Sequence, residues 1–170
     1  MGASLGGMVA NLSSHKRGWD SRWEEFSNWA EKAKTYQTQL LEMVDEDTNA
    51  FNKIMDAFGL AKKTDEEKAA RTKAIQDATI YATEVPLKTM DLCFGAMDVM
   101  KAMAETGNPN SVTDAGVGAI AAKAGVVGAF LNVKINCLDY KDKEFVKKII
   151  EAGEKIEINA KNIEEDIILN

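Results

Sequence analysis

The sequence predicts an all-α protein, a single-domain bundle of about five helices that spans residues 1–170. Apolar residues recur at steps of three and four along almost the whole chain, which is the spacing of a helix face that turns toward a core. No stretch alternates as a strand does, and no repeat or long linker divides the chain. Long helices joined by short connections favour antiparallel packing.

The first two helices are predicted from an apolar stretch and a capping pattern. A short apolar helix covers SLGGMVANLSS, and it starts so abruptly that we expect its first turns to precede Met1. Ser21 and Glu24 have capping-box spacing and are expected to open a long helix that ends near Gly59. Its core stripe is predicted to consist of Phe26, Ala30, Ala33, Gln37, Leu40, Val44, Asp47, Phe51, Ile54 and Phe58.

Three further helices follow. Thr64 and Glu67 form a second capping box, and the helix they open runs toward Thr106. Pro86 lies inside it and is expected to kink it, because proline lacks an N–H and frees the carbonyl one turn earlier. Ser111 and Asp114 are expected to cap a Gly/Ala-rich helix to about Cys137. The last helix begins at Asp142, with an inner stripe of Phe145, Ile149, Ala152, Ile156, Ile163 and Ile167.

Composition narrows the classes of partner and compartment. A net charge of -6 and a pI near 4.9 argue against nucleic acid, whose phosphates need a basic surface. Cys93 and Cys137 have no paired spacing and are expected to be reduced and buried in a cytoplasmic protein. The run AGVGAIAAKAGVVGAFLNV carries Lys123, so we expect a buried helix and no membrane span. The methionines between Met90 and Met103 are typical of core filler.

Several chemistries are excluded by residue type. His15 is the only histidine, which removes two-histidine zinc sites and Glu-x-x-His carboxylate-bridged sites, so no metal is expected. The spacing of Gly116 and Gly118 has no strand before it, and therefore indicates no nucleotide-binding loop.

Asp47 is the main candidate for catalysis. It falls on the predicted core stripe between Val44 and Phe51, where a carboxylate would be partly desolvated and suited to general acid–base chemistry. The alternative is that a slight rotation of the helix leaves Asp47 in a structural role.

Two asparagines form a second candidate group. Asn132 and Asn136 are four residues apart, so their side chains share one helix face amid apolar neighbours. Buried amides need partners and can both donate to and accept from a ligand. Hydrogen bonds between helices are the competing explanation.

The segment GNPNSVTDAG connects two predicted helices. Gly107 would end the first helix, Asn108 and Pro109 would make the turn, and Ser111 would cap the next helix. The Gly/Ala-rich helix that follows lets a neighbouring helix, a second subunit or a flat ligand approach its backbone closely.

Five stretches together resemble the cyclodeaminase/cyclohydrolase family, in the same order and over nearly the whole chain. They are MVANLS, VDEDTNAFNKIMDAFGL, EEKAARTKAIQDATIYATEVPL, GNPNSVTDAGVGA and GAFLNVKIN. That family comprises formiminotetrahydrofolate cyclodeaminases and methenyltetrahydrofolate cyclohydrolases. Its glycine-rich, serine-ending motif would lie before the segment matched here by GASLGGMVANLS, which agrees with the abrupt first helix.

The resemblance implies an all-helical, at least dimeric enzyme that uses no metal and binds folate among helices near the subunit interface. It implies closure of 5-formiminotetrahydrofolate to 5,10-methenyltetrahydrofolate with loss of ammonia, in histidine degradation, or else hydrolysis of the methenyl bridge to 10-formyltetrahydrofolate. A helical module that serves only oligomerisation is the remaining alternative. The site residues it implies are Asp47 as the proton-transfer group, Asn108, Asn110, Ser111, Asp114, Asn132 and Asn136 around the pterin, and Pro86 as a wall. Lys16 and Arg17 are the candidates for the anionic folate tail.

Overall fold

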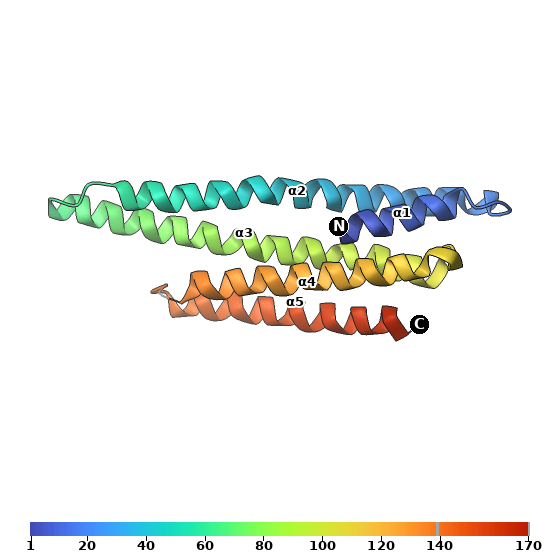
Figure 1. Cartoon of the computed structure of the whole chain (residues 1–170). Coiled ribbons are helices and arrows are strands. Elements are labelled where there is room, and N and C mark those ends of the chain that lie inside the picture. The colour runs from blue at the N-terminus through green and yellow to red at the C-terminus, as the bar shows by residue number, and fades with distance from the viewer. Residues whose placement is uncertain (139, 170) are drawn as a thin grey trace.

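The computed structural model describes residues 1–138 and 140–169, and within them it contains five α-helices and no strand. The helices are α1 (Gly2–Ser14), α2 (Trp23–Gly59), α3 (Asp65–Thr106), α4 (Val112–Cys137) and α5 (Lys143–Leu169). Two short 3-10 turns, Asp20–Arg22 and Pro109–Ser111, precede α2 and α4. Consecutive helices from α2 to α5 run antiparallel, and α1 lies beside the first half of α2 (Figure 1). The all-α bundle predicted from the sequence is confirmed.

Two of the predicted helix starts are confirmed, the one at Thr64 with its predicted cap and the one at Asp142 with a cap that was not predicted. The Thr64 hydroxyl accepts the Glu67 N–H at 3.2 Å, and the Glu67 carboxylate accepts the Thr64 N–H at 3.1 Å, which is a complete capping box. The Asp142 carboxylate accepts the N–H groups of Glu144 and Phe145 at 3.0 Å. These oxygens satisfy amide donors that have no partner in the first turn of a helix.

Two other predicted caps are wrong. Helix α2 starts at Trp23 after a 3-10 turn that includes Ser21, and its N-cap residue is Arg22, which pairs instead with Glu25. Ser111 does stand at the N-cap of α4, but its side chain makes no capping hydrogen bond there, because the 3-10 turn before it already shapes the entry. Asp114 therefore completes no capping box.

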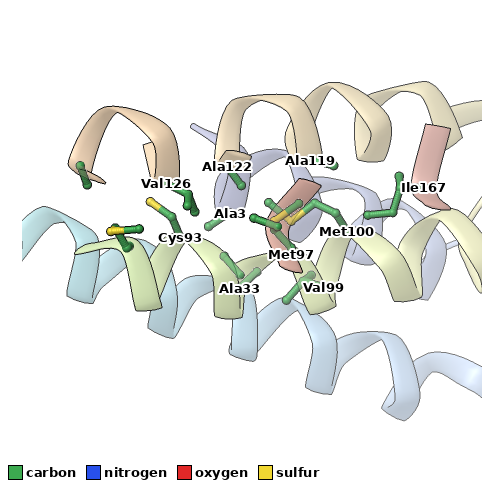
Figure 2. Packing of buried hydrophobic residues seen from close by; sticks show 14 of the residues in the cluster. Ala3, Ala33, Cys93, Met97, Val99, Met100, Ala119, Ala122, Val126 and Ile167 are labelled. Atoms are coloured by element: carbon green, nitrogen blue, oxygen red, sulfur yellow. The ribbon is translucent and has the colours of Figure 1, made fainter. Parts of the chain in front are cut away.

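Helix α3 is the centre of the bundle and packs against each of the other four helices. Met90, Met97, Met100 and Met103 are completely buried along it, which confirms their prediction as core residues. Figure 2 shows Met97 and Met100 surrounded by alanine and valine side chains from neighbouring helices. The helix continues through Pro86 without ending.

Small residues let the helices approach closely. A Cβ atom on Gly2 would lie 2.7 Å from the Gly118 carbonyl oxygen, so α1 crosses α4 at backbone contact. A Cβ atom on Gly153 would lie 2.2 Å from the ring of Phe130, which is 1% exposed and rests on α5 at that glycine. The Gly/Ala-rich composition of α4 is thus explained in large part by helix packing.

The core stripe of α2 differs from the prediction in its second half. Phe26 and Ala33 are buried as expected, but from there the inward residues are Met43, Ala50 and Ala57, seven apart. Val44, Asp47, Phe51 and Phe58 are exposed. The larger apolar side chains suggested the wrong face, because Ala50 and Ala57 are buried in this half of α2 and let α3 approach closely, with Met43 as the one larger residue of the three. Gln37 is exposed, and in α5 the predicted inner residue Ala152 is exposed while Gly153 is buried.

One helix of the described chain is long and apolar enough to cross a membrane, the stretch Pro109–Cys137 with a mean hydropathy of 1.6 in its best window. The core helix of a globular protein passes the same test of length and composition, so the expectation of a buried helix and no membrane span stays a prediction. A third of that window is buried inside the bundle, and Lys123 within it pairs with Glu164 of α5 at 2.6 Å.

Replacing Gly153 by alanine should destabilise the protein by about 1–3 kcal/mol, because the new methyl group would overlap the buried Phe130 ring. The matched control is Gly128→Ala in α4, where nothing lies within 4 Å of the added atom. That change should be neutral or stabilising by about 0.5–1 kcal/mol, since alanine favours a helix more than glycine does. Urea unfolding of the two variants measures both effects, and equal effects would contradict the packing at Gly153.

Candidate functional site

A cavity of about 380 Å³ opens where α2, α3 and α4 meet. We call it the Asp47 cavity. Its lining brings together three of the residues singled out in the sequence, Asp47 from α2, Pro86 from α3 and Asn132 from α4. The other lining residues are Leu40, Met43, Val44, Thr48, Thr89, Gly125 and Ala129. Three segments far apart in the chain thus converge on one concave surface.

The lining of the Asp47 cavity combines apolar walls with four polar residues, and sites for small organic ligands likewise place polar groups among apolar walls. Thr48 and Thr89 each donate their hydroxyl hydrogen to a carbonyl four residues earlier in their own helix, at 3.1 Å. Asp47 and Asn132 make no hydrogen bond to another residue that the structure describes. The Asp47 carboxylate and the Asn132 amide are therefore the polar groups of this cavity that are free to bond to a ligand.

Asp47 itself is exposed to solvent in the isolated chain, so the expectation of a partly desolvated carboxylate on the core stripe is wrong. The physical reason is the close α2–α3 contact described above, which turns Ala50 and Met43 inward and leaves Asp47 at the rim of the groove. Desolvation of this carboxylate requires something else to cover the rim, either a ligand or a second subunit.

Asn136 has a different environment from Asn132. Its side-chain amide donates to the carbonyl oxygen of Ala82 in α3 at 2.7 Å. Hydrogen bonding between helices, the alternative considered for this pair, is therefore present at Asn136. The residue also borders a neighbouring cavity of about 390 Å³, whose walls include Ile54, Phe58 and Lys141.

The turn between α3 and α4 is tied to the end of α1. The Asn108 side chain accepts the Asn110 N–H at 3.2 Å, and the Asn108 N–H donates to the Ser13 hydroxyl at 2.8 Å. Ser13 is buried and in turn donates to the Val9 carbonyl at 2.7 Å. Ser111 is buried in the same turn. The polar groups of Asn108 and Ser13 are thus satisfied within the chain, although not by the cap at Ser111 that the sequence predicted.

Gly107 ends α3 as predicted, with a φ of -76°, so the left-handed conformation common after helices is not used. A Cβ atom there would lie 2.5 Å from the Met103 carbonyl oxygen and 3.2 Å from Val9. The glycine is required by this close approach.

The turn and the Asp47 cavity are far apart within one chain. Asp114 and Asn132 are 18 positions apart on the same straight helix, which corresponds to about 27 Å. Asn108, Asn110 and Ser111 lie beyond Asp114, at the end of the bundle where α1 also ends. The structure therefore places the predicted residues in two groups, and a single chain does not bring them into one pocket.

Lys16 and Arg17 belong to the group at the turn end. The Lys16 ammonium lies 4.0 Å from the centre of the Trp19 ring, and Trp19 stacks on Phe26 at 5.5 Å. Arg17 is exposed. Neither residue lines the Asp47 cavity.

One polar cluster, formed by Glu46, Tyr81 and Lys53, was not predicted from the sequence. The Tyr81 hydroxyl donates to the Glu46 carboxylate in a short hydrogen bond, and Lys53 lies 3.7 Å from the centre of the Tyr81 ring. The bond to Glu46 raises the pKa of Tyr81 above its usual value. Tyr81 and Lys53 also line a shallow cavity of about 490 Å³ between α2 and α3. No spacing rule connects residues 35 positions apart, so only the folded α2–α3 pair shows this contact.

Comparison with known proteins gives consistent matches along the chain. The family model described as formiminotransferase-cyclodeaminase matches residues 1–155. A methenyltetrahydrofolate cyclohydrolase from Methylorubrum extorquens is 37% identical over 98% of this chain and 80% of its own length. The formimidoyltransferase-cyclodeaminase of Rattus norvegicus is 32% identical over 87% of this chain, and the match spans 27% of that longer protein.

A solved structure agrees with these relatives. The crystal structure of formiminotetrahydrofolate cyclodeaminase from Thermotoga maritima superposes with a TM-score of 0.84 at 25% identity, over 98% of this chain and 79% of that one. The shared fold, the family match over most of the chain and the two enzyme relatives agree with one another. The chain belongs to the formiminotransferase-cyclodeaminase family of folate one-carbon enzymes.

Proposed function

We propose that this protein closes 5-formiminotetrahydrofolate to 5,10-methenyltetrahydrofolate with release of ammonia, using the Asp47 cavity. The observation that carries the proposal is the convergence of Asp47, Pro86 and Asn132 on one cavity with both apolar walls and polar groups. Relatives named for cyclodeaminase activity support the choice of reaction.

The reaction passes through a tetrahedral carbon between two folate nitrogens. One folate nitrogen attacks the carbon of the protonated formimino group (C=NH₂⁺) and loses its proton. The carbon–nitrogen bond to the resulting amine then breaks as that amine gains a proton and leaves as ammonia, so the positive charge stays on the methenyl product. Asp47 is proposed to accept the first proton and return it to the leaving nitrogen. The Asn132 amide is proposed to orient the substituents of the reacting carbon, while the apolar walls hold the flat pterin.

A second candidate reaction uses the same cavity. Hydrolysis of 5,10-methenyltetrahydrofolate adds water to the bridging carbon and breaks one of its bonds to nitrogen, giving 10-formyltetrahydrofolate. The observation that favours it is the 37% identity to a methenyltetrahydrofolate cyclohydrolase over 98% of this chain. Both reactions place a tetrahedral carbon beside a carboxylate, so Asp47 would have the same role in each.

We also propose a homodimer formed through the outer face of α2. Leu41, Val44, Phe51, Met55 and Phe58 are between 51% and 64% exposed along this face. A monomer rarely leaves such a row of large apolar side chains in water. Val44 also lines the Asp47 cavity, so a partner on this face would cover the exposed carboxylate and supply the desolvation that the isolated chain lacks.

The remaining predicted residues keep their proposed roles at the other end of the bundle. Asn108, Asn110, Ser111 and Asp114 are proposed to contact folate only where a second subunit brings this end to an Asp47 cavity. Lys16 and Arg17 are proposed contacts of the anionic tail. Asn136 is not among them, because its NH₂ group donates to the Ala82 carbonyl. A cytoplasmic location, a role in histidine degradation, and the absence of metal, nucleotide, nucleic-acid and membrane partners remain predictions from the sequence.

Replacing Asp47 by asparagine should lower kcat by roughly 10²–10⁴-fold, the usual effect of removing a general acid–base group. Formation of methenyltetrahydrofolate from 5-formiminotetrahydrofolate, and its hydrolysis, are followed by absorbance. The matched control is Asp45→Asn, an exposed carboxylate of the same helix outside the cavity, which should leave kcat unchanged. Near-normal turnover by the Asp47→Asn variant would show that Asp47 is not the proton-transfer group. A wild-type protein that acts on neither folate yet forms a stable oligomer would instead support the role of an assembly module.

Replacing Phe51 by aspartate should convert the dimer to a monomer, because each dimer would bury the new charge twice at the proposed interface. Sedimentation or light scattering measures the change in mass. Ile158→Asp is the control, since Ile158 is 59% exposed on α5, away from the face concerned. A dimer that survives Phe51→Asp and dissociates with Ile158→Asp would assign the interface to α5.

Replacing Lys16 and Arg17 together by alanine should raise KM for a substrate with a long polyglutamate tail and leave KM for the monoglutamate form unchanged. The reason is that only the longer tail carries extra carboxylates to meet these cations. Lys62→Ala with Lys63→Ala is a control pair of exposed lysines at the opposite tip of the bundle. Equal KM changes for the two substrate forms would refute a tail contact.

A further inference from the structure

Pro86 leaves one carbonyl of α3 without its usual donor. In an α-helix the N–H of residue 86 would donate to the carbonyl of Ala82, four residues earlier. Proline has no N–H, so this bond is missing although α3 continues on both sides. Ala82 is only 8% exposed, and water therefore has little access to replace the donor. A buried carbonyl in this position needs another partner.

Asn136 of α4 supplies that partner. Its amide nitrogen lies 2.7 Å from the Ala82 oxygen, a good hydrogen-bond distance. Only the NH₂ end of the amide can donate to a carbonyl, so the bond also fixes the orientation of the Asn136 side chain. A side chain of α4 thus takes the place of a main-chain N–H of α3.

The bond lies one helical turn from the Asp47 cavity. Asn132 precedes Asn136 by four residues, shares its helix face, and lines the cavity together with Pro86 and Asp47. A shift of α4 by a single residue would turn its side chains by about 100° and carry Asn132 away from Asp47.

On the side of α4 that faces the Asp47 cavity, few side chains oppose such a shift, whereas on its core side Val126, Phe130 and Val133 are buried and also hold the helix. The cavity-lining residues of α4 before Asn132 are Gly125 and Ala129, which offer a smooth surface with few side chains to interlock. A directional hydrogen bond defines rotation and register more sharply than contacts between small residues do.

We propose that Asn136 is a positioning residue: it completes the hydrogen bonding that Pro86 interrupts and, together with the core packing of α4, fixes the register that places Asn132 opposite Asp47. Its NH₂ group is committed to Ala82 and is not a substrate ligand. The consequence for turnover rests on the proposed function, whereas the link between Pro86 and Asn136 does not.

The test is a double-mutant cycle with Asn136→Ala, Pro86→Ala and the variant that carries both. In the Pro86→Ala background residue 86 regains an N–H that can donate to Ala82, so the Asn136 amide becomes dispensable. With Pro86 present, Asn136→Ala should lower the urea midpoint and lower kcat roughly tenfold under conditions where the variant is fully folded. With alanine at 86, the same change should alter kcat by less than about twofold and leave the urea midpoint in place.

Two measurements separate positioning from stability alone. A role restricted to stability would leave kcat of the fully folded variant unchanged, and this result would overturn the positioning role. The side-chain NH₂ signals of Asn132 in protein labelled with ¹⁵N-asparagine should shift on Asn136→Ala with Pro86 present, and should not shift further when the change is made with alanine at 86. This readout, like the urea midpoint, is independent of whether the protein acts on folate.

Asn132→Ala is the matched control, since it removes an amide from the same helix face without touching Ala82. Its effect on the urea midpoint should be the same with proline or alanine at 86. Asn136→Leu, which keeps volume but not the donor, serves if Asn136→Ala does not fold, and recovery of folding on adding Pro86→Ala would support the proposal. If Asn136→Ala lowered the urea midpoint and kcat equally with proline and with alanine at position 86, the proposal would be overturned. If the wild-type protein had no activity on folate, the proposed function would be wrong. The unfolding and NMR measurements would still decide whether Asn136 replaces the donor that Pro86 lacks.

Discussion

The close approach of neighbouring helices to α3 is the constraint on which the rest of the structure depends. A helix that contacts four others cannot have large side chains on every side without forcing its neighbours apart. The chain meets this requirement with methionines along α3 itself and with alanine and glycine on the helices that face it. Flexible methionines fill the irregular space that remains.

The same constraint determines what lies outside. Because α2 turns Met43, Ala50 and Ala57 toward α3, its larger apolar residues face outward, where they form a continuous surface beside the Asp47 cavity. The residues of the chain best suited to burial are therefore left for a second molecule to cover. The same distribution of small and large side chains on α2 thus determines both how α2 packs on α3 and which face is left for a second subunit.

Features of the fold that depend on residues close together in the sequence could be predicted, whereas features that depend on contacts between helices could not. Helical periodicity and the cap at Thr64 are decided by residues within a few positions, and both were predicted correctly. The inner face of α2 could not be predicted, because two apolar stripes compete there and their ranking depends on the distance to α3. Ser111 has the right spacing for a cap, but the preceding 3-10 turn makes its side chain unnecessary in that role. Asn132 and Asn136 looked equivalent, and only the position of Ala82 on another helix separates them.

The proline of α3 has a consequence for how this chain can change over evolutionary time. A helix with an N–H at position 86 makes no demand on position 136, whereas a helix with proline there requires a donor from α4. Substitutions at these two positions are therefore not independent, although the two lie 50 positions apart in the chain. Among descendants of this sequence, loss of the asparagine should be tolerated mainly in lineages that have already lost the proline, so the pair is inherited as a unit.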